Sequence, residues 1–298
     1  MEANASRNSN GTTRALNFYK RIIRIDENTF STFAPARLDL RLEIVSGRIG
    51  KLLDIKATAQ TVSICDHVTL IRQGSEFVSL EGSIEKRSKI KKVLTEMEKA
   101  TGKSLPCTII LQKSIPDRAG LGSNATSAAA VMRLANHAFE LGLGAEQLEN
   151  IAMRVSHDIM FAIRGGKVMI EGAERKRVTR MEEGDHPYFL IASPRKLSLP
   201  KLVFGEYQRT GAKLNDIIFK MYPESRMLME AMDKAMERGI SGTGPTVYGA
   251  YPTFKDCHSM KNRLEGWNFD GRIFIAEPIG MLQQYVSEDF TSSDGSQI

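Results

Sequence analysis

The chain has 298 residues, of which 42% are hydrophobic, 26% charged and 7% aromatic, and its formal net charge is +6. These values exclude a disordered or fibrous protein, and the length is sufficient for one large core or two smaller ones. The positive charge suits an anionic partner such as a nucleotide or a phosphorylated metabolite. Because the basic residues are dispersed and only one Trp accompanies them, a dedicated nucleic-acid reader is a weak interpretation.

Cysteine usage and hydropathy indicate in which cellular compartment the protein is expected. The three cysteines, Cys65, Cys107 and Cys257, are far apart in the sequence, so we expect reduced thiols, no zinc site and a cytoplasmic location. No apolar run reaches the roughly 18 residues that a membrane-spanning helix needs, so no membrane association is expected. Residues 1–30 are expected to form a flexible leader, and a plastid location stays open if that leader is a transit peptide.

The first half of the chain predicts strands and helices in mixed order. Alternating apolar and polar residues predict a half-buried strand at 33–45, and further strands are expected at 60–72 and 107–113. Apolar residues at helical spacing predict a helix at 85–100. After a glycine turn, further helices are expected up to Gly142, at 145–155 and from Asp158.

The composition resets at about residue 180, and a second α+β unit is expected from there. Its predicted strands are 187–193, 246–251 and 272–276, and its predicted helices are 214–222, 224–238 and 255–264. A stretch interrupted by prolines follows the first of these strands, and the tail after residue 287 is polar and expected to be loose. The order of elements fits neither strict βαβ alternation nor a repeat array, so the fold class is α+β.

The glycine turn in IPDRAGLGSNATSAAA, residues 115–130, has the composition of an anion site. Glycines permit close backbone approach, and the N–H groups at the start of the following helix attract negative charge. The candidate phosphate-binding residues are Gly120, Leu121, Gly122, Ser123, Asn124, Ala125 and Thr126. The alternative is a plain glycine corner with Ser123 or Asn124 as helix cap. A dinucleotide fingerprint lacks its second strand here, and a Walker loop lacks its Gly-Lys-Ser/Thr.

The same turn resembles the Pro-x-x-x-Gly-Leu-Gly-Ser-Ser phosphate loop of the GHMP kinases, the family of galactose, homoserine, mevalonate and phosphomevalonate kinases. Three more stretches are similar, in the same order, to one branch, the 4-diphosphocytidyl-2-C-methyl-D-erythritol kinases. They are Ala34-Pro35-Ala36-Arg37-Leu38-Asp39-Leu40, the segment 156–172 with SHDIMFAIRGGKVMIEG, and the segment 241–248 with SGTGPTVY. Four ordered matches are far more specific than one glycine pair.

The resemblance implies a two-domain GHMP-kinase fold, with an N-terminal ribosomal-protein-S5-like domain and a C-terminal ferredoxin-like α+β domain. The expected division is a leader at 1–30, the ATP-binding domain at 31–178, the C-terminal domain at 179–287 and a polar tail at 288–298. It also implies an ATP-dependent phosphotransferase that phosphorylates an alcohol group of a small metabolite in isoprenoid biosynthesis. Its cofactors would be ATP and Mg²⁺, with the metal held mainly by the phosphates rather than by a protein cage. A homodimer stays open.

The resemblance places the catalytic residues at Asp158, as the base that takes the hydroxyl proton, and at Arg37, where the family carries Lys. The expected substrate-binding residues are Asp39, His157, Ser241, Gly242, Thr243 and Gly244. The residue-level alternatives are a helix cap for Asp158, a surface strand position for Arg37 and a structural role for His157.

Three departures from the branch keep the substrate open. Arg37 replaces a Lys, Asp39 replaces an Asn, and residues 47–54, GRIGKLLD, lack the Tyr and His with which the branch binds cytosine. Arg37 keeps the positive charge but cannot shuttle protons, and Asp39 adds negative charge where a phosphate ester would lie. The alternatives are therefore a GHMP kinase for another small alcohol, a catalytically silent nucleotide-binding relative, or an RNA-associated protein.

Overall fold

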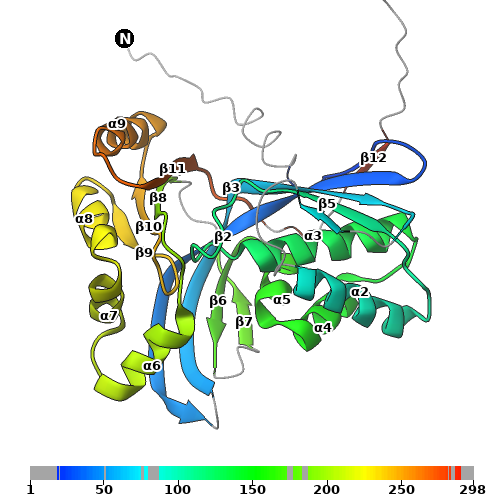
Figure 1. The fold of residues 1–298 in the computed structure, drawn as a ribbon, viewed down its shortest axis with the longest axis horizontal. Coiled ribbons are helices and arrows are strands. Elements are labelled where there is room, and N and C mark those ends of the chain that lie inside the picture. The colour runs from blue at the N-terminus through cyan, green and yellow to red at the C-terminus, as the bar shows by residue number, and fades with distance from the viewer. Residues whose placement is uncertain are drawn as a thin grey trace, which may run out of the picture.

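Two sheets lie side by side in the computed structural model, and each is covered by its own group of helices (Figure 1). The structure describes residues 19, 21–49, 52–74, 77–79, 87–172, 177–182, 187–280, 282 and 286–289. Within these residues the fold is α+β, as the sequence predicts. No helix among them has both the length and the apolar character needed to cross a membrane.

The larger sheet has eight strands and is built around a long hairpin. Its strands are β1 (Arg21–Arg24), β2 (Thr29–Ile49), β3 (Leu52–Ile71), β4 (Phe77–Ser79), β5 (Thr108–Gln112), β6 (Lys167–Glu171), β7 (Arg177–Arg180) and β12 (Val286–Asp289). The main path is β12-β1-β2-β3-β5-β4, and β6 pairs with the other half of β3 and with β7. The hairpin of β2 and β3 therefore extends between the two groups of helices (Figure 1).

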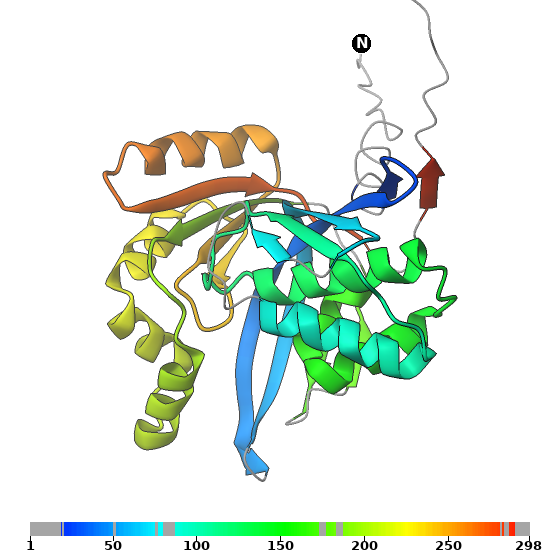
Figure 2. The same cartoon turned by 45° about the vertical axis from the view of Figure 1, so that its right-hand side comes forward.

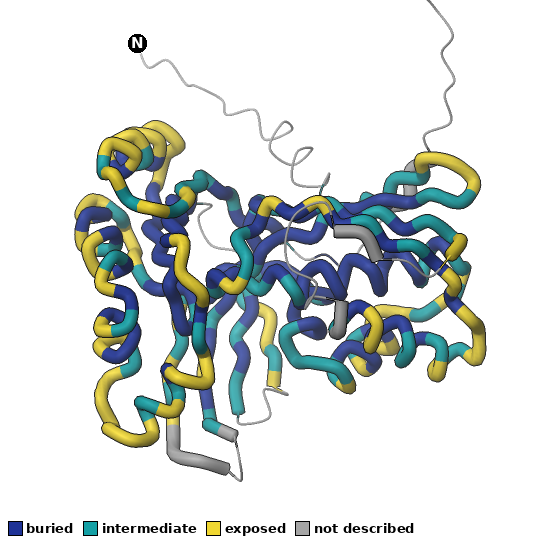
Figure 3. Tube along the Cα trace, in the orientation of Figure 1, coloured by how far each residue is buried: buried dark blue, intermediate teal, exposed yellow. Residues whose placement is uncertain are grey.

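Four helices pack on the larger sheet, namely α2 (Arg87–Thr101), α3 (Ser123–Ala138), α4 (Ala145–Val155) and α5 (His157–Arg164). The alanine-rich α3 is the central one, and every residue in it is buried except Asn124, Asn136 and His137 (Figure 3). Its small side chains let the helix approach the sheet, α2 and α5 closely, which explains the alanine run.

The smaller sheet has the strand order β11-β8-β10-β9 and is antiparallel throughout. Its strands are β8 (Tyr188–Pro194), β9 (Glu237–Ile240), β10 (Val247–Tyr251) and β11 (Gly271–Ala276). The helices beside it are α6 (Pro200–Thr210), α7 (Leu214–Met221), α8 (Pro223–Ala231) and α9 (Phe254–Glu265), and Figure 2 shows them on the side of the molecule away from α2–α5.

A third core joins the two sheets. Leu38 and Val62 of the larger sheet pack with Ile191 and Tyr248 of the smaller one, and all four are fully buried or nearly so. The Tyr248 hydroxyl donates a 2.7 Å hydrogen bond to the Leu40 carbonyl of β2. Because this core is apolar and continuous, it fixes the loop between β9 and β10 against β2, which is where the site lies.

The structure corrects two predicted elements. The helix predicted at 224–238 ends at Ala231, and residues 237–240 form strand β9. Arg238 donates hydrogen bonds to the carbonyls of Met229 and Glu230, which satisfies the end of α8, and β9 completes the sheet edge beside β10. The stretch with prolines contains α6, which begins at Pro200, where the missing N–H costs no helical hydrogen bond.

The predicted segment boundaries also shift. Strand β1 lies inside the predicted leader, 1–30, and pairs with β12, which covers the start of the predicted tail, 288–298. The boundary predicted at residue 178 falls inside β7, which pairs with β6 of the larger sheet. These strands are short and lie at the periphery of the sheet, so their sequences carry little apolar periodicity.

Candidate active site

The glycine turn packs directly against the loop between β9 and β10. Gly120 has φ +85°, and a Cβ there would lie 2.8 Å from the Ser241 carbonyl oxygen and 3.0 Å from that of Gly244. The Ser241 hydroxyl donates to the Gly120 carbonyl at 2.9 Å and accepts from the Asp39 N–H at 3.1 Å. Ser241 therefore joins the glycine turn to β2, and Gly120 cannot be replaced without moving this contact.

The end of the turn forms the start of α3. Gly122 is the N-cap, with φ 70° and no side-chain cap, so the alternative of Ser123 or Asn124 as cap is wrong. The first N–H groups of α3 have no intrahelical acceptor by geometry. Leu121 and Ala125 are buried, and the Leu121 carbonyl accepts from the Arg37 N–H at 3.0 Å. The Ala125 N–H donates to the Gly122 carbonyl at 2.9 Å, so neither the buried side chains nor these two backbone groups are available to a ligand.

The hydroxyls at the start of α3 are already engaged inside the protein. The Ser123 hydroxyl lies 2.6 Å from Lys113 Nζ, and the Thr126 hydroxyl donates to the Ser123 carbonyl at 3.1 Å. In contrast, the buried Oδ1 of Asn124 has no hydrogen-bond partner among the described residues. Asn124 is therefore the side chain of this helix start that still needs a polar partner.

One guanidinium holds two carboxylates beside the turn. Arg37 Nη1 donates to Asp158 Oδ1 at 2.7 Å, and Arg37 Nε lies 2.9 Å from Asp39 Oδ1. Arg37 and Asp39 are on β2, whereas Asp158 is in the first turn of α5, where the helix dipole favours a carboxylate. The Asp158 side chain is 32% exposed, compared with 14% for Arg37. Asp158 is therefore fixed by Arg37 and still reachable.

The electrostatics keep Arg37 charged. Burial alone lowers the pKa of the Arg37 guanidinium, but the charges of Asp39 and Asp158 outweigh it and raise this pKa above its ordinary value. Arg37 also lies over the Phe161 ring, with Cζ 5.5 Å from the centroid. The side chain is thus a fixed cation, consistent with the prediction that it cannot shuttle protons.

A pocket of about 190 Å³ opens beside these charges. Arg37, Asp39, His157 and Asp158 lie at one part of its wall, together with Gly242 and Thr243. The other part is mainly apolar and is lined by Leu42, Ile55, Ala57, Met160, Ile170, Val178, Pro200 and Phe204. The pocket thus brings together residues that the sequence places far apart, and its lining combines charged and polar side chains with apolar ones.

Two of the predicted substrate residues shape the wall of the pocket, Gly242 through its backbone and Thr243 through a loop that its hydroxyl helps to hold. A Cβ on Gly242 would lie 2.8 Å from Asp39 Oδ2, and Gly242 has φ +59°. The Thr243 hydroxyl shares a 3.1 Å hydrogen bond with Ser198, which orients the loop from the far side. Gly244, in the same loop, packs against Gly120 and Ile218 and does not line the pocket.

Two polar residues of the site region are missing from the sequence prediction. Asp66 and Lys113 form a buried ion pair directly beneath the start of α3. The sequence signal for them is weak, because each lies in or next to a predicted strand where a charged residue is normally exposed. Residues 47–52, part of the stretch noted for its missing Tyr and His, have no described side chains.

Residues 88–166 match the family model for the GHMP kinases N terminal domain. The chain is 26% identical over 254 residues to 4-diphosphocytidyl-2-C-methyl-D-erythritol kinase of Ectopseudomonas mendocina, which covers 78% of this chain and 86% of that relative. It is 23% identical over 281 residues to the kinase of the same name from Listeria welshimeri, covering 83% and 96%.

Solved structures share the fold. A 4-(cytidine 5'-diphospho)-2C-methyl-D-erythritol kinase superposes with a TM-score of 0.70 at 18% identity and covers 84% of this chain and 99% of that one. The Methanococcus jannaschii mevalonate kinase gives 0.63 at 12% identity, with coverages of 84% and 98%. Residues 88–166 therefore match the N-terminal domain of the GHMP kinases, the fold is that of the two-domain GHMP kinases, and the predicted fold class is confirmed. The chain resembles the 4-diphosphocytidyl-2-C-methyl-D-erythritol kinases in sequence over most of its length.

Proposed function

We propose that the protein is an ATP-dependent phosphotransferase that phosphorylates an alcohol group of a small metabolite; its relatives are named 4-diphosphocytidyl-2-C-methyl-D-erythritol kinase. The observation that carries the proposal is the position of Arg37. Its backbone N–H bonds to Leu121 in the glycine turn, and its guanidinium holds Asp158 at 2.7 Å in the pocket. One residue thus links the predicted phosphate site to the predicted base.

The turn and the start of α3 would bind the nucleotide phosphates. Gly120 and Gly122 bring the backbone close, and the first N–H groups of α3 supply donors with the positive end of the helix dipole. The hydroxyls of Ser123 and Thr126 are occupied inside the protein, and the N–H groups of Ala125 and Thr126 donate to the Gly122 carbonyl at 2.9 and 3.1 Å. The donors that helix geometry leaves for phosphate are therefore the N–H groups of Ser123 and Asn124. The Asn124 Oδ1 is an acceptor without a partner, so it would face a donor such as a metal-bound water rather than a phosphate oxygen.

Asp158 would take the proton of the attacking hydroxyl. It is exposed enough to meet a substrate, and the bond from Arg37 fixes its orientation without removing its charge. Arg37 remains protonated and would stabilise negative charge that develops near the transferring group. Phosphoryl transfer depends mainly on such positioning and charge stabilisation, so this arrangement is suited to it.

Mg²⁺ would accompany the nucleotide rather than occupy a protein cage. No group of three His, Cys, Asp or Glu side chains among the described residues could hold a metal ion. The Asn124 oxygen fits a metal-bound water, because it is a buried acceptor that lacks a donor. When bound through the phosphates, the ion supplies charge neutralisation.

The acceptor alcohol would lie between Asp158 and the apolar wall. His157, Gly242 and Thr243 would contact it, and Asp39 would face it from beside Arg37. The alcohol named for the relatives, 4-diphosphocytidyl-2-C-methyl-D-erythritol, is the first compound to test. Mevalonate and homoserine, named for neighbours of the same fold, are the next.

The experiment is an ADP-release assay with Mg²⁺, ATP and each of these alcohols. We expect turnover with at least one alcohol and a loss of about 10²–10⁴-fold in kcat for Asp158→Asn with ATP binding retained. Asp216→Asn is the matched control, since Asp216 also lies in the first turn of a helix but is exposed on α7. ATP binding without turnover of any alcohol would support the silent nucleotide-binding relative instead.

A further inference from the structure

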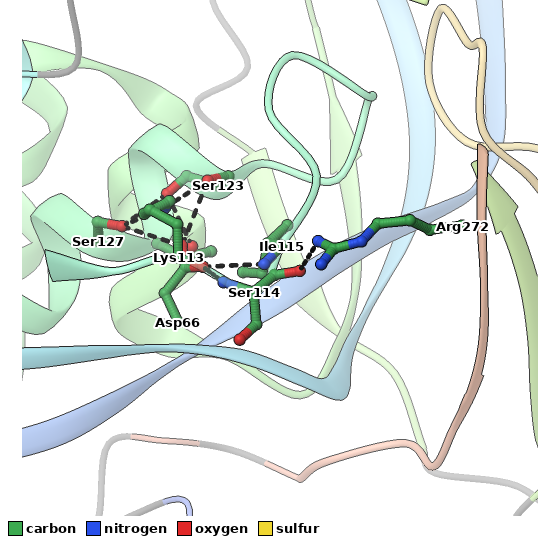
Figure 4. A network of polar contacts seen from close by, with 8 residues as sticks. Asp66, Lys113, Ser114, Ile115, Ser123, Ser127 and Arg272 are labelled. Carbon is green, nitrogen blue, oxygen red and sulfur yellow. Dashed lines mark hydrogen bonds and ion pairs between the residues drawn. The ribbon is translucent and has the colours of Figure 1, made fainter. Parts of the chain in front are cut away.

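A buried ion pair lies beneath the glycine turn and outside the pocket. Asp66, on β3, is completely buried, and Lys113, directly after β5, is 8% exposed. Lys113 Nζ contacts Asp66 Oδ2, and Figure 4 shows the pair among Ser114, Ile115, Ser123 and Ser127. None of the proposed chemical steps uses these two residues.

The carboxylate of Asp66 fixes the beginning of the turn. Its Oδ1 accepts two backbone hydrogen bonds, from the N–H of Ser114 at 2.8 Å and from that of Ile115 at 2.9 Å. These are the first two residues after Lys113, where the chain leaves β5. Two bonds from adjacent N–H groups to one oxygen define the direction in which the chain departs from the strand.

The ammonium of Lys113 fixes the other end. It donates to the Ser123 hydroxyl at 2.6 Å and to the Ser127 hydroxyl at 3.1 Å. Ser123 is the first residue of α3, and Ser127 lies one turn further along the same face. The two ends of the segment 114–122 are therefore tied to one ion pair. The first end is held through Asp66, and the second through Lys113 and a 3.3 Å bond from the Ser123 hydroxyl to Asp66 Oδ2.

A buried ion pair of this kind contributes little stability relative to apolar residues of the same size, because both charges lose their hydration. Desolvation lowers the pKa of Lys113, and the charge of Asp66 opposes this effect. What such a pair does provide is directional bonding to specific groups. All of its remaining bonds here go to the two ends of the glycine turn and to Ser127.

We propose that Asp66 and Lys113 are positioning residues that set the separation between the two ends of the glycine turn and thereby the fit of the nucleotide phosphates. The proposal rests on the proposed function, because it assumes that the turn binds phosphate. It places the effect on the phosphate part of the nucleotide alone. Removal of the pair is expected to weaken ligands that carry phosphates and to leave the binding of adenosine unchanged.

The test compares ADP and adenosine binding by calorimetry in the wild type and in the double variant Asp66→Asn/Lys113→Met. This variant leaves no uncompensated buried charge, and the amide oxygen that replaces the Asp66 carboxylate is still an acceptor for the two N–H groups. We expect the Kd for ADP to rise about tenfold or more, whereas that for adenosine changes less than about twofold. Ser127→Ala is the matched control, because it removes the Lys113 contact that lies inside α3 and leaves the Ser123 contact in place.

The outcomes separate the two proposals. A wild type that does not bind ADP would count against the proposed function. A wild type that binds ADP, with a double variant that binds it equally well, would overturn the positioning role alone, and so would an equal loss for ADP and adenosine. If circular dichroism shows that the double variant with Met is unfolded, Asp66→Asn/Lys113→Gln takes its place. The Gln side chain is one atom shorter than Lys, so we expect the same selective loss of ADP binding.

Discussion

Arg37 Nη1 donates to Asp158 at 2.7 Å while Arg37 Nε lies 2.9 Å from Asp39, so a single buried cation serves two carboxylates from different elements. Asp39 and Arg37 are two residues apart on β2, whereas Asp158 comes from α5. The three side chains carry a net charge of −1 if both carboxylates are ionised. This charge balance shapes two of the predictions below.

The first prediction concerns the cation itself. Arg37→Met should lower kcat by about 10²–10³-fold, because Asp158 loses its orientation and the transferring group loses a nearby positive charge. Arg37→Lys should retain part of the activity, since an ammonium restores the charge but cannot engage both carboxylates in the planar geometry of a guanidinium. Steady-state kinetics with varied ATP and alcohol measures both variants. Unchanged kcat in Arg37→Met would exclude a role for Arg37 in catalysis.

The second prediction concerns Asp39 and the charge of the acceptor. Asp39→Asn removes one negative charge from the pocket and should favour phosphorylated acceptors by about tenfold relative to unphosphorylated ones, or roughly 1–2 kcal/mol. The measurement is the ratio of kcat/KM for 4-diphosphocytidyl-2-C-methyl-D-erythritol to that for 2-C-methyl-D-erythritol. Glu43→Gln is the control, because Glu43 lies on the same strand but forms an exposed pair with Arg41. An equal ratio in wild type and Asp39→Asn contradicts the prediction.

The third prediction separates backbone strain from steric contact at the glycine turn. Gly120 and Gly142 both have positive φ, +85° and +68°, but only Gly120 faces atoms that a Cβ would meet. Gly142→Ala should therefore cost about 1 kcal/mol in unfolding free energy from conformation alone. Gly120→Ala should cost more, about 2–3 kcal/mol, and should also weaken ADP binding, because the Ser241 and Gly244 carbonyls must move. Urea unfolding and calorimetry test both variants, and equal effects of the two would show that the contact with Ser241 is unimportant.

Local patterns predicted the parts of the fold whose periodicity is strong. The helix at 145–155 and the strand at 107–113 lie within about one residue of α4 and β5, because a short apolar run defines the strand and apolar spacing after Gly144 defines the helix. The helix predicted at 224–238 is too long. Most of it, MLMEAMDKAMER, is rich in helix-forming residues, but the pairing of β9 with β10 outweighs that propensity. Tertiary pairing is invisible to a local pattern.

The site divides in the same way. The glycine turn has a local signature, whereas Arg37 and Asp158 are 121 residues apart, so only the family resemblance connected them before the structure did. No motif of the family resemblance included Asp66 or Lys113. A buried ion pair between two strands has the same sequence signature as two exposed charges, so its position under the turn had to come from the fold.

The fourth prediction concerns alkaline stability through Cys107. This thiol is 3% exposed, and burial, with a smaller contribution from the charge of Glu98, raises its pKa to about 11. In the unfolded chain the thiol ionises near its ordinary pKa of about 8.5, so between that pH and about 11 the unfolded state binds fewer protons than the folded state. Its stabilising contribution is thus complete below about pH 8.5 and is lost as the pH rises through 11. Urea unfolding under reducing conditions at several pH values should show the wild type losing about 2–3 kcal/mol relative to Cys107→Ala across this window. A difference between the two proteins that stays constant from about pH 8 to 11 would show that the Cys107 thiol does not contribute to the pH dependence.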